Sequence, residues 1–154
     1  MNEIAMLPGT NLLLGTWKLR SFAQMLETGE RCPVIGEHPD GYISYSADGR
    51  MYAIAASDGR VKPRDETPAD EEAILLYRTM FSYAGTYTVE GDKLIHHVDI
   101  SWNEAFTGTE QVRSYYLDSD ILTITTAPNK VTIDGREGPL VAVWEKLPGG
   151  PRHG

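Results

Sequence analysis

His96 is the side chain in this sequence that is best suited to proton transfer. It lies in Lys93–Trp102, an alternating segment whose more apolar face consists of Leu94, His96, Val98, Ile100 and Trp102. Because side chains alternate between the two faces of a strand, this pattern predicts that His96 points inward and His97 outward. A neutral imidazole in apolar surroundings could act as a general acid or base near neutral pH. It could equally form a hydrogen bond to a tyrosine and have a structural role alone.

Arg113 and several tyrosines are the other candidates for chemistry. If Arg113 points inward, its buried charge requires a carboxylate partner or an anionic ligand group. Donors from tyrosine hydroxyls could bind a ligand carbonyl and stabilise an oxyanion formed by enolisation. The candidate catalytic residues are therefore His96, Tyr45 and Arg113. The candidate ligand-binding residues are Tyr45, Tyr87, His96, Trp102, Arg113 and Tyr115.

The motifs of metal and cofactor chemistry are missing from the sequence. His96 and His97 are adjacent, so on a strand they point to opposite faces and cannot readily share one metal ion. No Cys-x-x-Cys pair, phosphate-binding glycine loop, dinucleotide glycine motif or Gly-x-Ser-x-Gly elbow is present. The single cysteine, Cys32, has no neighbouring histidine that would activate it as a nucleophile. We expect no metal site and no cofactor.

The elements that must position these residues are short strands. Strand-like composition is found at Gly15–Met25, Gly41–Ser46, Met51–Ala56, Gly85–Glu90, Lys93–Trp102, Glu110–Leu117, Ile121–Thr126 and Pro139–Leu147. Tight hairpin signals separate three pairs, at Asp48-Gly49, Gly91-Asp92 and Ser119-Asp120. A further short piece, Arg31–Ile35, is expected to pair with the first strand. Eight or nine such strands predict an all-β antiparallel meander, and closing it into a barrel removes its exposed edges.

Alternation on the first and last strands predicts which side chains fill the barrel. On the last strand, Leu140, Ala142 and Trp144 form the apolar face. On the first strand, the apolar face is formed by Trp17, Leu19 and Ala23, together with Ser21. A one-residue bulge would reverse such an assignment for the rest of the strand.

One segment has helical rather than strand-like spacing. Thr67 and Pro68 predict a helix start, with Thr67 as N-cap and Pro68 at the first helical position. The following acidic residues favour the positive end of the helix dipole. An apolar stripe of Ala73, Leu76, Tyr77 and Met80 follows. We expect a helix that ends near Ser82 and covers an opening or edge of the barrel, as a plug or as a lid.

Length and charge limit the possible partners. A chain of 154 residues suits one domain, here taken as residues 1–154 with the barrel at about 13–147 and a flexible tail at 148–154. The formal charge of −8, without a cluster of Lys and Arg, argues against nucleic acid and anionic membranes as partners. One cysteine, no signal-peptide pattern at the start and no long apolar run favour a cytoplasmic protein. A homodimer is compatible with these features.

An ordered set of short motifs makes the sequence similar to the lipocalin-like group of the calycin superfamily, in particular its bacterial members. The motifs span about Leu13 to Leu147. They are Gly15-Thr16-Trp17, Gly41-Tyr42-Ile43-Ser44-Tyr45, Asp48-Gly49-Arg50-Met51, Tyr83-Ala84-Gly85-Thr86-Tyr87, His96-His97-Val98, Gly108-Thr109-Glu110-Gln111-Val112-Arg113 and Trp144-Glu145-Lys146-Leu147.

The resemblance implies a calycin barrel with one short helix, in which Trp17 closes one end and a basic side chain from a late strand packs over its ring. Lys146 is the candidate for that contact and Arg113 the alternative. A lysine at this position departs from the more usual arginine and cannot stack on the indole with a planar guanidinium.

Three functions remain open at this point, since a fold alone does not define an activity. The first is binding of a small, largely hydrophobic molecule by a carrier, sequestering protein or sensor. The second is a cofactor-independent isomerase, cyclase or hydratase that acts on a polyketide- or terpenoid-like compound. The third is a protein-interaction module whose barrel is filled by its own side chains. The first two predict an internal cavity, and the third predicts none.

Overall fold

The computed structural model of the chain describes residues 11–126, 131–133 and 135–149. Predictions for the residues before Asn11 and after residue 149 therefore lie outside the described residues. The strands are β1 (Gly15–Met25), β2 (Arg31–Pro33), β3 (Asp40–Tyr45), β4 (Arg50–Ala56), β5 (Met80–Glu90), β6 (Lys93–Ser101), β7 (Glu110–Asp118), β8 (Ile121–Thr125), β9 (Val131–Ile133), β10 (Arg136–Gly138) and β11 (Leu140–Lys146). The helices are α1 (Asp70–Arg78) and the short 3₁₀ helix η1 (Glu104–Phe106).

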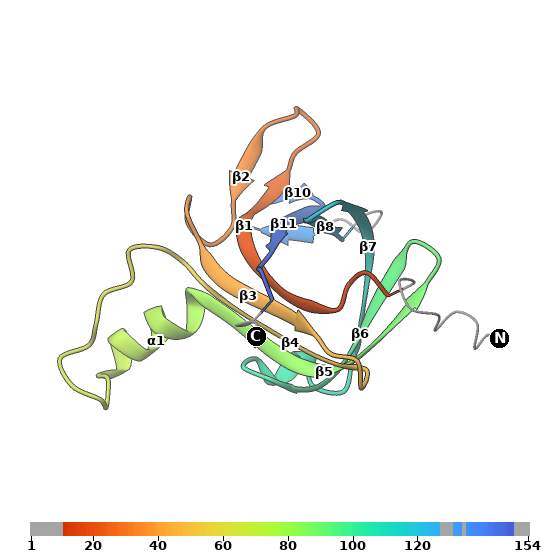
Figure 1. Cartoon of the computed structure of the whole chain (residues 1–154). Helices are drawn as coiled ribbons and strands as arrows, with labels where there is room; N and C mark the ends of the chain where they lie inside the picture. The colour runs from red at the N-terminus through yellow and green to blue at the C-terminus, as the bar shows by residue number, and fades with distance from the viewer. Residues whose placement is uncertain (1–10, 127–130, 134, 150–154) are drawn as a thin grey trace.

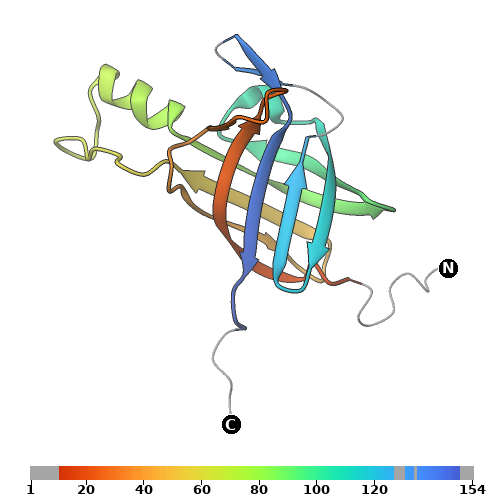
Figure 2. The ribbon, with the colours of Figure 1, turned by 90° about the horizontal axis from the view of Figure 1, so that it is seen from above.

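Eight of these strands form a closed antiparallel barrel, which confirms the predicted fold class (Figures 1 and 2). Strands β3 to β8 follow one another as neighbours, and β1 closes the ring by pairing with both β3 and β11. The three predicted hairpin turns join β3 to β4, β5 to β6 and β7 to β8. Strand β2 adds to β1 outside the ring, as predicted for Arg31–Ile35, while β9 and β10 form a separate small hairpin.

A bulge in β1 corrects the predicted face of its second half. The pairing of β1 with β11 shifts register between Leu19 and Ser21. After this shift Phe22 lies opposite Ala142 and lines the barrel interior with it. The prediction that Ser21 and Ala23 share the inner face with Trp17 and Leu19 is therefore wrong, because one extra residue reverses the alternation.

A second bulge lies between β5 and β6. The register shifts at Ala84 and Gly85, which pair with Ile100 and Val98 respectively and leave Asp99 without a direct partner. Leu94, His96 and Val98 are buried as predicted, but Ile100 is 64% exposed. The inward assignment of Ile100 is wrong, because the extra residue at the bulge interrupts the alternation of side chains. Trp102 lines the cavity as predicted.

Helix α1 differs from its prediction in both its ends and its packing. Ala69 is the N-cap, and its backbone N–H donates to the Glu72 carboxylate at 2.8 Å. The helix therefore begins after the predicted cap Thr67, and it ends at Arg78 because β5 starts at Met80. None of its residues is buried, and Figure 2 shows it projecting away from the strands. It meets the barrel at its C-terminal end, where the Tyr77 ring lies 6.1 Å from that of Trp102, so it is not a plug.

Trp17 fills one end of the barrel. Its side chain is fully buried, and its indole N–H donates to the Leu13 carbonyl at 2.9 Å. The ammonium group of Lys146, which pairs with Trp17 across β1 and β11, lies 5.4 Å from the ring centroid. The cation over this ring is thus Lys146, and Arg113 lies elsewhere, at the barrel cavity. Such a contact contributes about 0.5–1 kcal/mol at a partly solvated site.

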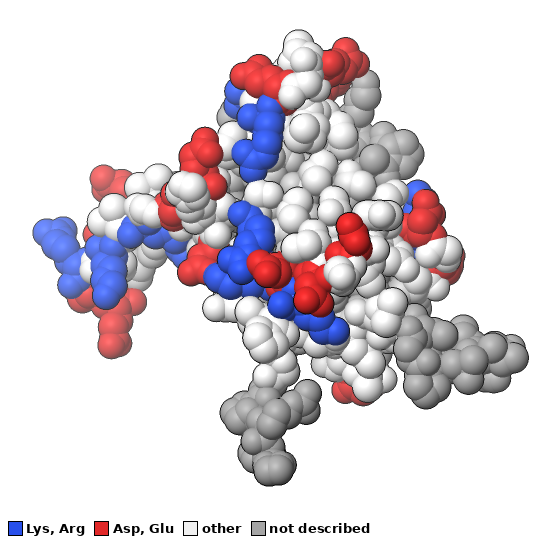
Figure 3. Space-filling model, turned by 45° about the horizontal axis from the view of Figure 1, so that its top comes forward, with Lys and Arg blue, Asp and Glu red and all other residues white. Residues whose placement is uncertain are grey.

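The outer surface carries charges of both signs. Figure 3 shows acidic and basic side chains interspersed on the face in view. Arg20 pairs with Glu145 at 2.6 Å and Arg50 with Asp99 at 2.9 Å, and all four side chains are about half exposed. Within the described residues, no helix has the length and apolar character needed to cross a membrane.

Candidate functional site

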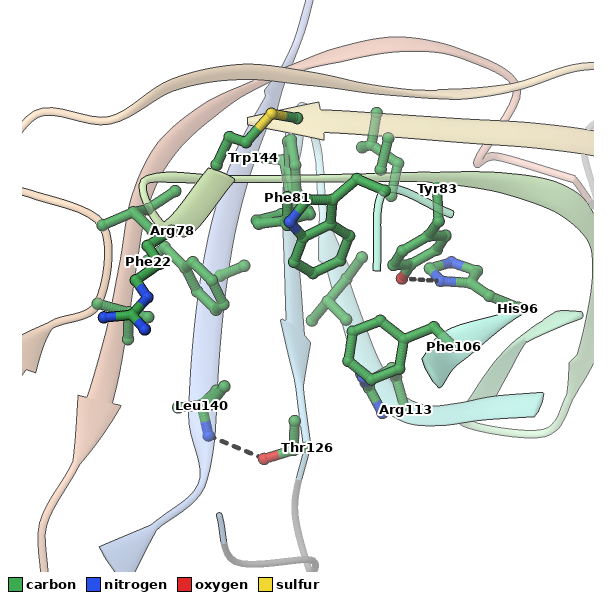
Figure 4. Close-up of a pocket in the computed structure, with 18 residues that line it drawn as sticks. Phe22, Arg78, Phe81, Tyr83, His96, Phe106, Arg113, Thr126, Leu140 and Trp144 are labelled. Carbon is green, nitrogen blue, oxygen red and sulfur yellow. Dashed lines mark hydrogen bonds between the residues drawn. The ribbon is translucent and has the colours of Figure 1, made fainter. Parts of the chain in front are cut away.

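The barrel contains a cavity of about 330 Å³ that is partly open to solvent (Figure 4). Most of its wall is apolar and aromatic, with side chains from β1, β5, η1, β8 and β11 that include Phe22, Phe81, Phe106, Ile124 and Trp144. The polar or charged side chains along the same wall are Arg78, Tyr83, His96, Arg113 and Thr126. Figure 4 shows Tyr83, His96, Phe106 and Arg113 grouped at one side of the pocket. This combination of an apolar wall with few polar groups is typical of a small-molecule site.

His96 lies between two tyrosine hydroxyls. Its Nε2 is 2.8 Å from the Tyr45 hydroxyl and its Nδ1 is 2.7 Å from the Tyr83 hydroxyl. Burial, with a smaller contribution from the positive charge of Arg113, lowers the pKa of His96 from 6.5 to about 3. The imidazole is therefore neutral at pH 7, with one nitrogen that donates and one that accepts.

The surroundings of Tyr45 define which nitrogen of His96 carries the proton. The Tyr45 side chain is 1% exposed, and among the described residues its hydroxyl has no hydrogen-bond partner besides His96. If Nε2 donated to it, the Tyr45 hydroxyl proton would be buried without an acceptor, which costs about 1–3 kcal/mol. We infer that Tyr45 donates to Nε2 and that Nδ1–H donates to Tyr83. The Tyr83 hydroxyl proton is then free to point into the cavity.

Burial also controls the ionisation of the two tyrosines. It raises the pKa of Tyr83 to about 12, against the smaller opposing effect of the Arg113 charge. Burial raises the pKa of Tyr45 as well. Both hydroxyls are therefore protonated at neutral pH, and the chain from Tyr45 through His96 to Tyr83 contains only neutral groups.

Arg113 supplies a cation at the cavity wall. Its guanidinium donates to the Val112 carbonyl at 3.1 Å and to the Gln111 side-chain oxygen at 3.0 Å, and both acceptors are neutral. Within the described part of the chain, Arg113 makes no ion pair with a carboxylate. Two carboxylates on β6 and β7 pair with other side chains: Asp99 with Arg50 and Glu110 with His97. The positive charge of Arg113 is thus not compensated by the protein at this place.

Trp144 lines the same wall with its ring, but its indole nitrogen is covered by protein atoms. The side chain is 2% exposed, and the N–H has no hydrogen-bond partner among the described residues. Buried N–H groups of this kind are rare in folded proteins, because an unmade hydrogen bond is costly.

The structure separates the predicted site residues into two groups. His96, Trp102 and Arg113 line the cavity. Tyr45 and Tyr87 are buried beyond it, with ring centroids 4.8 Å apart, and Tyr115 packs against the core without lining the cavity. The Tyr87 hydroxyl donates to the Ser46 carbonyl and accepts from the Asn11 amide, so it is already occupied.

Sequence reasoning misses Tyr83 and Phe22 as cavity residues. The sequence assigns Tyr83 to no strand, because the predicted helix extends to Ser82, whereas the observed β5 begins at Met80. Strand alternation places Phe22 outside, and the bulge in β1 reverses that placement. Trp144 lies on the inner face as predicted, but no pattern in the sequence indicates that its N–H lacks a partner among the described residues.

Metal ligands do not converge in the described residues. No three His, Cys, Asp or Glu side chains there lie close enough to hold one ion. His97 points outward to Glu110 and Thr88, away from His96, and Cys32 is buried in β2. The polar groups of the cavity are thus nitrogen and hydroxyl donors rather than a metal-binding set.

A closed antiparallel barrel with an apolar internal cavity is the architecture of small-molecule-binding barrels. The chain belongs to the lipocalin-like domain family, whose model matches residues 14–147. It is similar to the 4'-hydroxy-3'-methoxypropiophenone carrier protein of Aspergillus oryzae, with 31% identity over 87 residues that cover 51% of this chain and 78% of that protein.

Two solved structures are similar to the chain. A lipocalin-like protein from Bacteroides uniformis has a TM-score of 0.47 and 13% identity, covering 88% of this chain and 98% of that one. A protein from Bacteroides eggerthii has a TM-score of 0.45 and 13% identity, covering 88% of this chain and 99% of that one.

Proposed function

We propose that the protein binds a small, largely hydrophobic organic molecule inside its barrel and thereby carries, sequesters or senses it. The observation that carries this proposal is the cavity of about 330 Å³ with its aromatic wall. Its volume lies near the lower end of the roughly 300–1,000 Å³ of ligand pockets, which suits a compact molecule. The name of the Aspergillus oryzae relative as a carrier of an aromatic ketone agrees with this class of function.

The environment of His96 favours binding over proton-transfer catalysis. Both ring nitrogens are already hydrogen-bonded to tyrosines, and the imidazole is neutral because its pKa lies near 3. A substrate proton would have to reach His96 through Tyr83, whose own pKa of about 12 makes it a poor base at pH 7. A cofactor-independent isomerase, cyclase or hydratase is therefore the second candidate. A filled barrel that serves protein interactions is disfavoured by the cavity.

A fluorescence titration with N-phenyl-1-naphthylamine, a neutral apolar probe, tests the proposal. Ala142→Leu should weaken probe binding at least tenfold, because residue 142 is 8% exposed and lines the cavity. Ala105→Leu, the matched control in the exposed helix η1, should bind as the wild type does. Thermal melts verify that both variants fold.

Saturable binding of one probe per chain, weakened by Ala142→Leu alone, would support the proposal. Absence of saturable binding by the wild type, or equal binding by wild type and a folded Ala142→Leu variant, would refute binding within the barrel.

A further inference from the structure

We propose that the ligand is an organic anion, with a compact apolar body and a carboxylate that Arg113 and Tyr83 bind. This inference rests on the proposed binding function and specifies the chemistry of the molecule bound. It is carried by an imbalance in the cavity, whose described wall presents several hydrogen-bond donors and a cation but no acidic side chain.

The first step is the charge of the cavity wall. Both ionised side chains along it are arginines, Arg78 at the end of α1 and Arg113 in β7, and no Asp or Glu is among the described lining residues. The chain as a whole has a formal charge of −8. A basic cavity in an acidic protein does not follow from composition, so the local charge indicates the charge of the ligand.

The second step is the state of Arg113. A half-buried guanidinium with only neutral partners is unfavourable relative to one that is paired with an anion. Its planar array of donors matches the two oxygens of a carboxylate, and such charge-assisted hydrogen bonds are about twice as strong as neutral ones. A carboxylate at the cavity side of Arg113 would complete this pairing.

The third step is the direction of the Tyr83 hydroxyl. Because Tyr45 donates to His96 and His96 donates to Tyr83, the Tyr83 oxygen is already an acceptor and its proton remains for the ligand. Figure 4 shows Tyr83 and Arg113 on the same side of the pocket. A ligand oxygen at this side would receive a neutral donor from Tyr83 and a charged one from Arg113.

The hydroxyl of Tyr83 and the guanidinium of Arg113 together favour a ligand with acceptor oxygens. A hydrocarbon would leave the Tyr83 proton without an acceptor and Arg113 without an anionic partner. The cavity therefore selects for molecules that carry acceptor oxygens at this side.

The test compares naphthalene-2-carboxylate with naphthalene-2-carboxamide, which has nearly the same shape without the charge. Each compound displaces N-phenyl-1-naphthylamine from the protein at pH 7. We expect the carboxylate to compete at a concentration at least tenfold lower than the amide. Arg113→Gln should reduce this preference to less than threefold and leave competition by the amide within threefold of wild type.

Two further variants separate the charge of Arg113 from its geometry and from general effects of losing an arginine. Arg50→Gln is the matched control, since Arg50 is an exposed arginine that pairs with Asp99 outside the cavity, and it should retain the full preference. Arg113→Lys keeps the charge but loses the planar fork, so it should show an intermediate preference and serves if Arg113→Gln does not fold.

The outcomes separate this inference from the proposed function. Equal competition by acid and amide in the wild type, with the probe still bound, would overturn the anion assignment and leave the binding function intact. A full preference in a folded Arg113→Gln or Arg113→Lys variant would overturn the role of Arg113. Failure of the neutral probe to bind would refute the proposed function itself.

Discussion

Acidification from pH 7 to pH 5 should destabilise the protein through His96. The folded protein holds this imidazole neutral, with a pKa near 3, while the unfolded chain has the ordinary value of 6.5. Between these two values the unfolded state binds a proton that the folded state does not. The stability associated with His96 is therefore fully present above about pH 6.5 and falls as the pH decreases toward 3.

The size of the effect follows from the two pKa values. At pH 5 the unfolded imidazole is almost fully protonated and the folded one almost fully neutral. Integrating the linkage relation from pH 7 to pH 5 gives a loss of about 2 kcal/mol in the free energy of unfolding. A loss of that size is a large part of the stability of a typical small domain, about 5–15 kcal/mol.

Urea unfolding at pH 7 and pH 5, followed by circular dichroism, measures this loss. The non-titrating variant His96→Gln should be less stable at pH 7 but should lose about 2 kcal/mol less than the wild type on acidification. His97→Gln is the matched control, because His97 is the neighbouring residue on the outer face of β6 and bonds to Glu110 and Thr88. It should keep most of the wild-type dependence on pH.

His96 bonds to no carboxylate, so carboxylates contribute equally to the wild type and to His96→Gln, and the difference between these two isolates His96. If wild type and His96→Gln lost stability in parallel between pH 7 and pH 5, the neutral, doubly bonded state of His96 would be refuted. A titration of the His96 ring by NMR with a midpoint near 6.5 would refute it directly.

Two further predictions concern the barrel itself. Lys146→Met should lower the unfolding free energy by about 0.5–1 kcal/mol in urea, because it removes the cation over Trp17 while keeping an apolar stem. In a Trp17→Leu background, which has no aromatic ring, Lys146→Met should cost much less. The same loss in both backgrounds would contradict the contact. Gly85→Ala should destabilise the protein by about 1–3 kcal/mol, since a Cβ there would collide with the backbone carbonyl of His97 at the bulge. An unchanged melting temperature in that variant would show that the bulge can relax.

The overall barrel could be predicted from sequence because its signals are local. Alternating runs, turn residues such as Asp48-Gly49 and the position of Trp17 each reflect the backbone nearby. The bulges at Leu19/Ser21 and Ala84/Gly85 could not be predicted in the same way. A bulge depends on how two strands distant in sequence fit around the ring, and no local pattern of residues encodes that fit.

The cavity was predictable only in outline. The inward orientation of His96 follows from strand alternation, and burial of its side chain confirms it. Its contact with Tyr83, however, depends on where α1 ends and β5 begins, which differs from the sequence prediction by several residues. Similarly, the apolar stripe expected on α1 did not produce a packed helix, since the local period says nothing about whether a partner surface exists.

The core and the cavity are connected through the same hydrogen-bond chain. Tyr45 packs against Tyr87 in the core, and its single described acceptor is His96, so its hydroxyl proton has one direction. His96 transmits this constraint, because a neutral imidazole that accepts at Nε2 must donate at Nδ1. Tyr83 is thereby left with its proton toward the cavity beside the Arg113 charge. A ligand acceptor at that side meets donors whose direction was fixed when the barrel folded, and little reorganisation is then needed on binding.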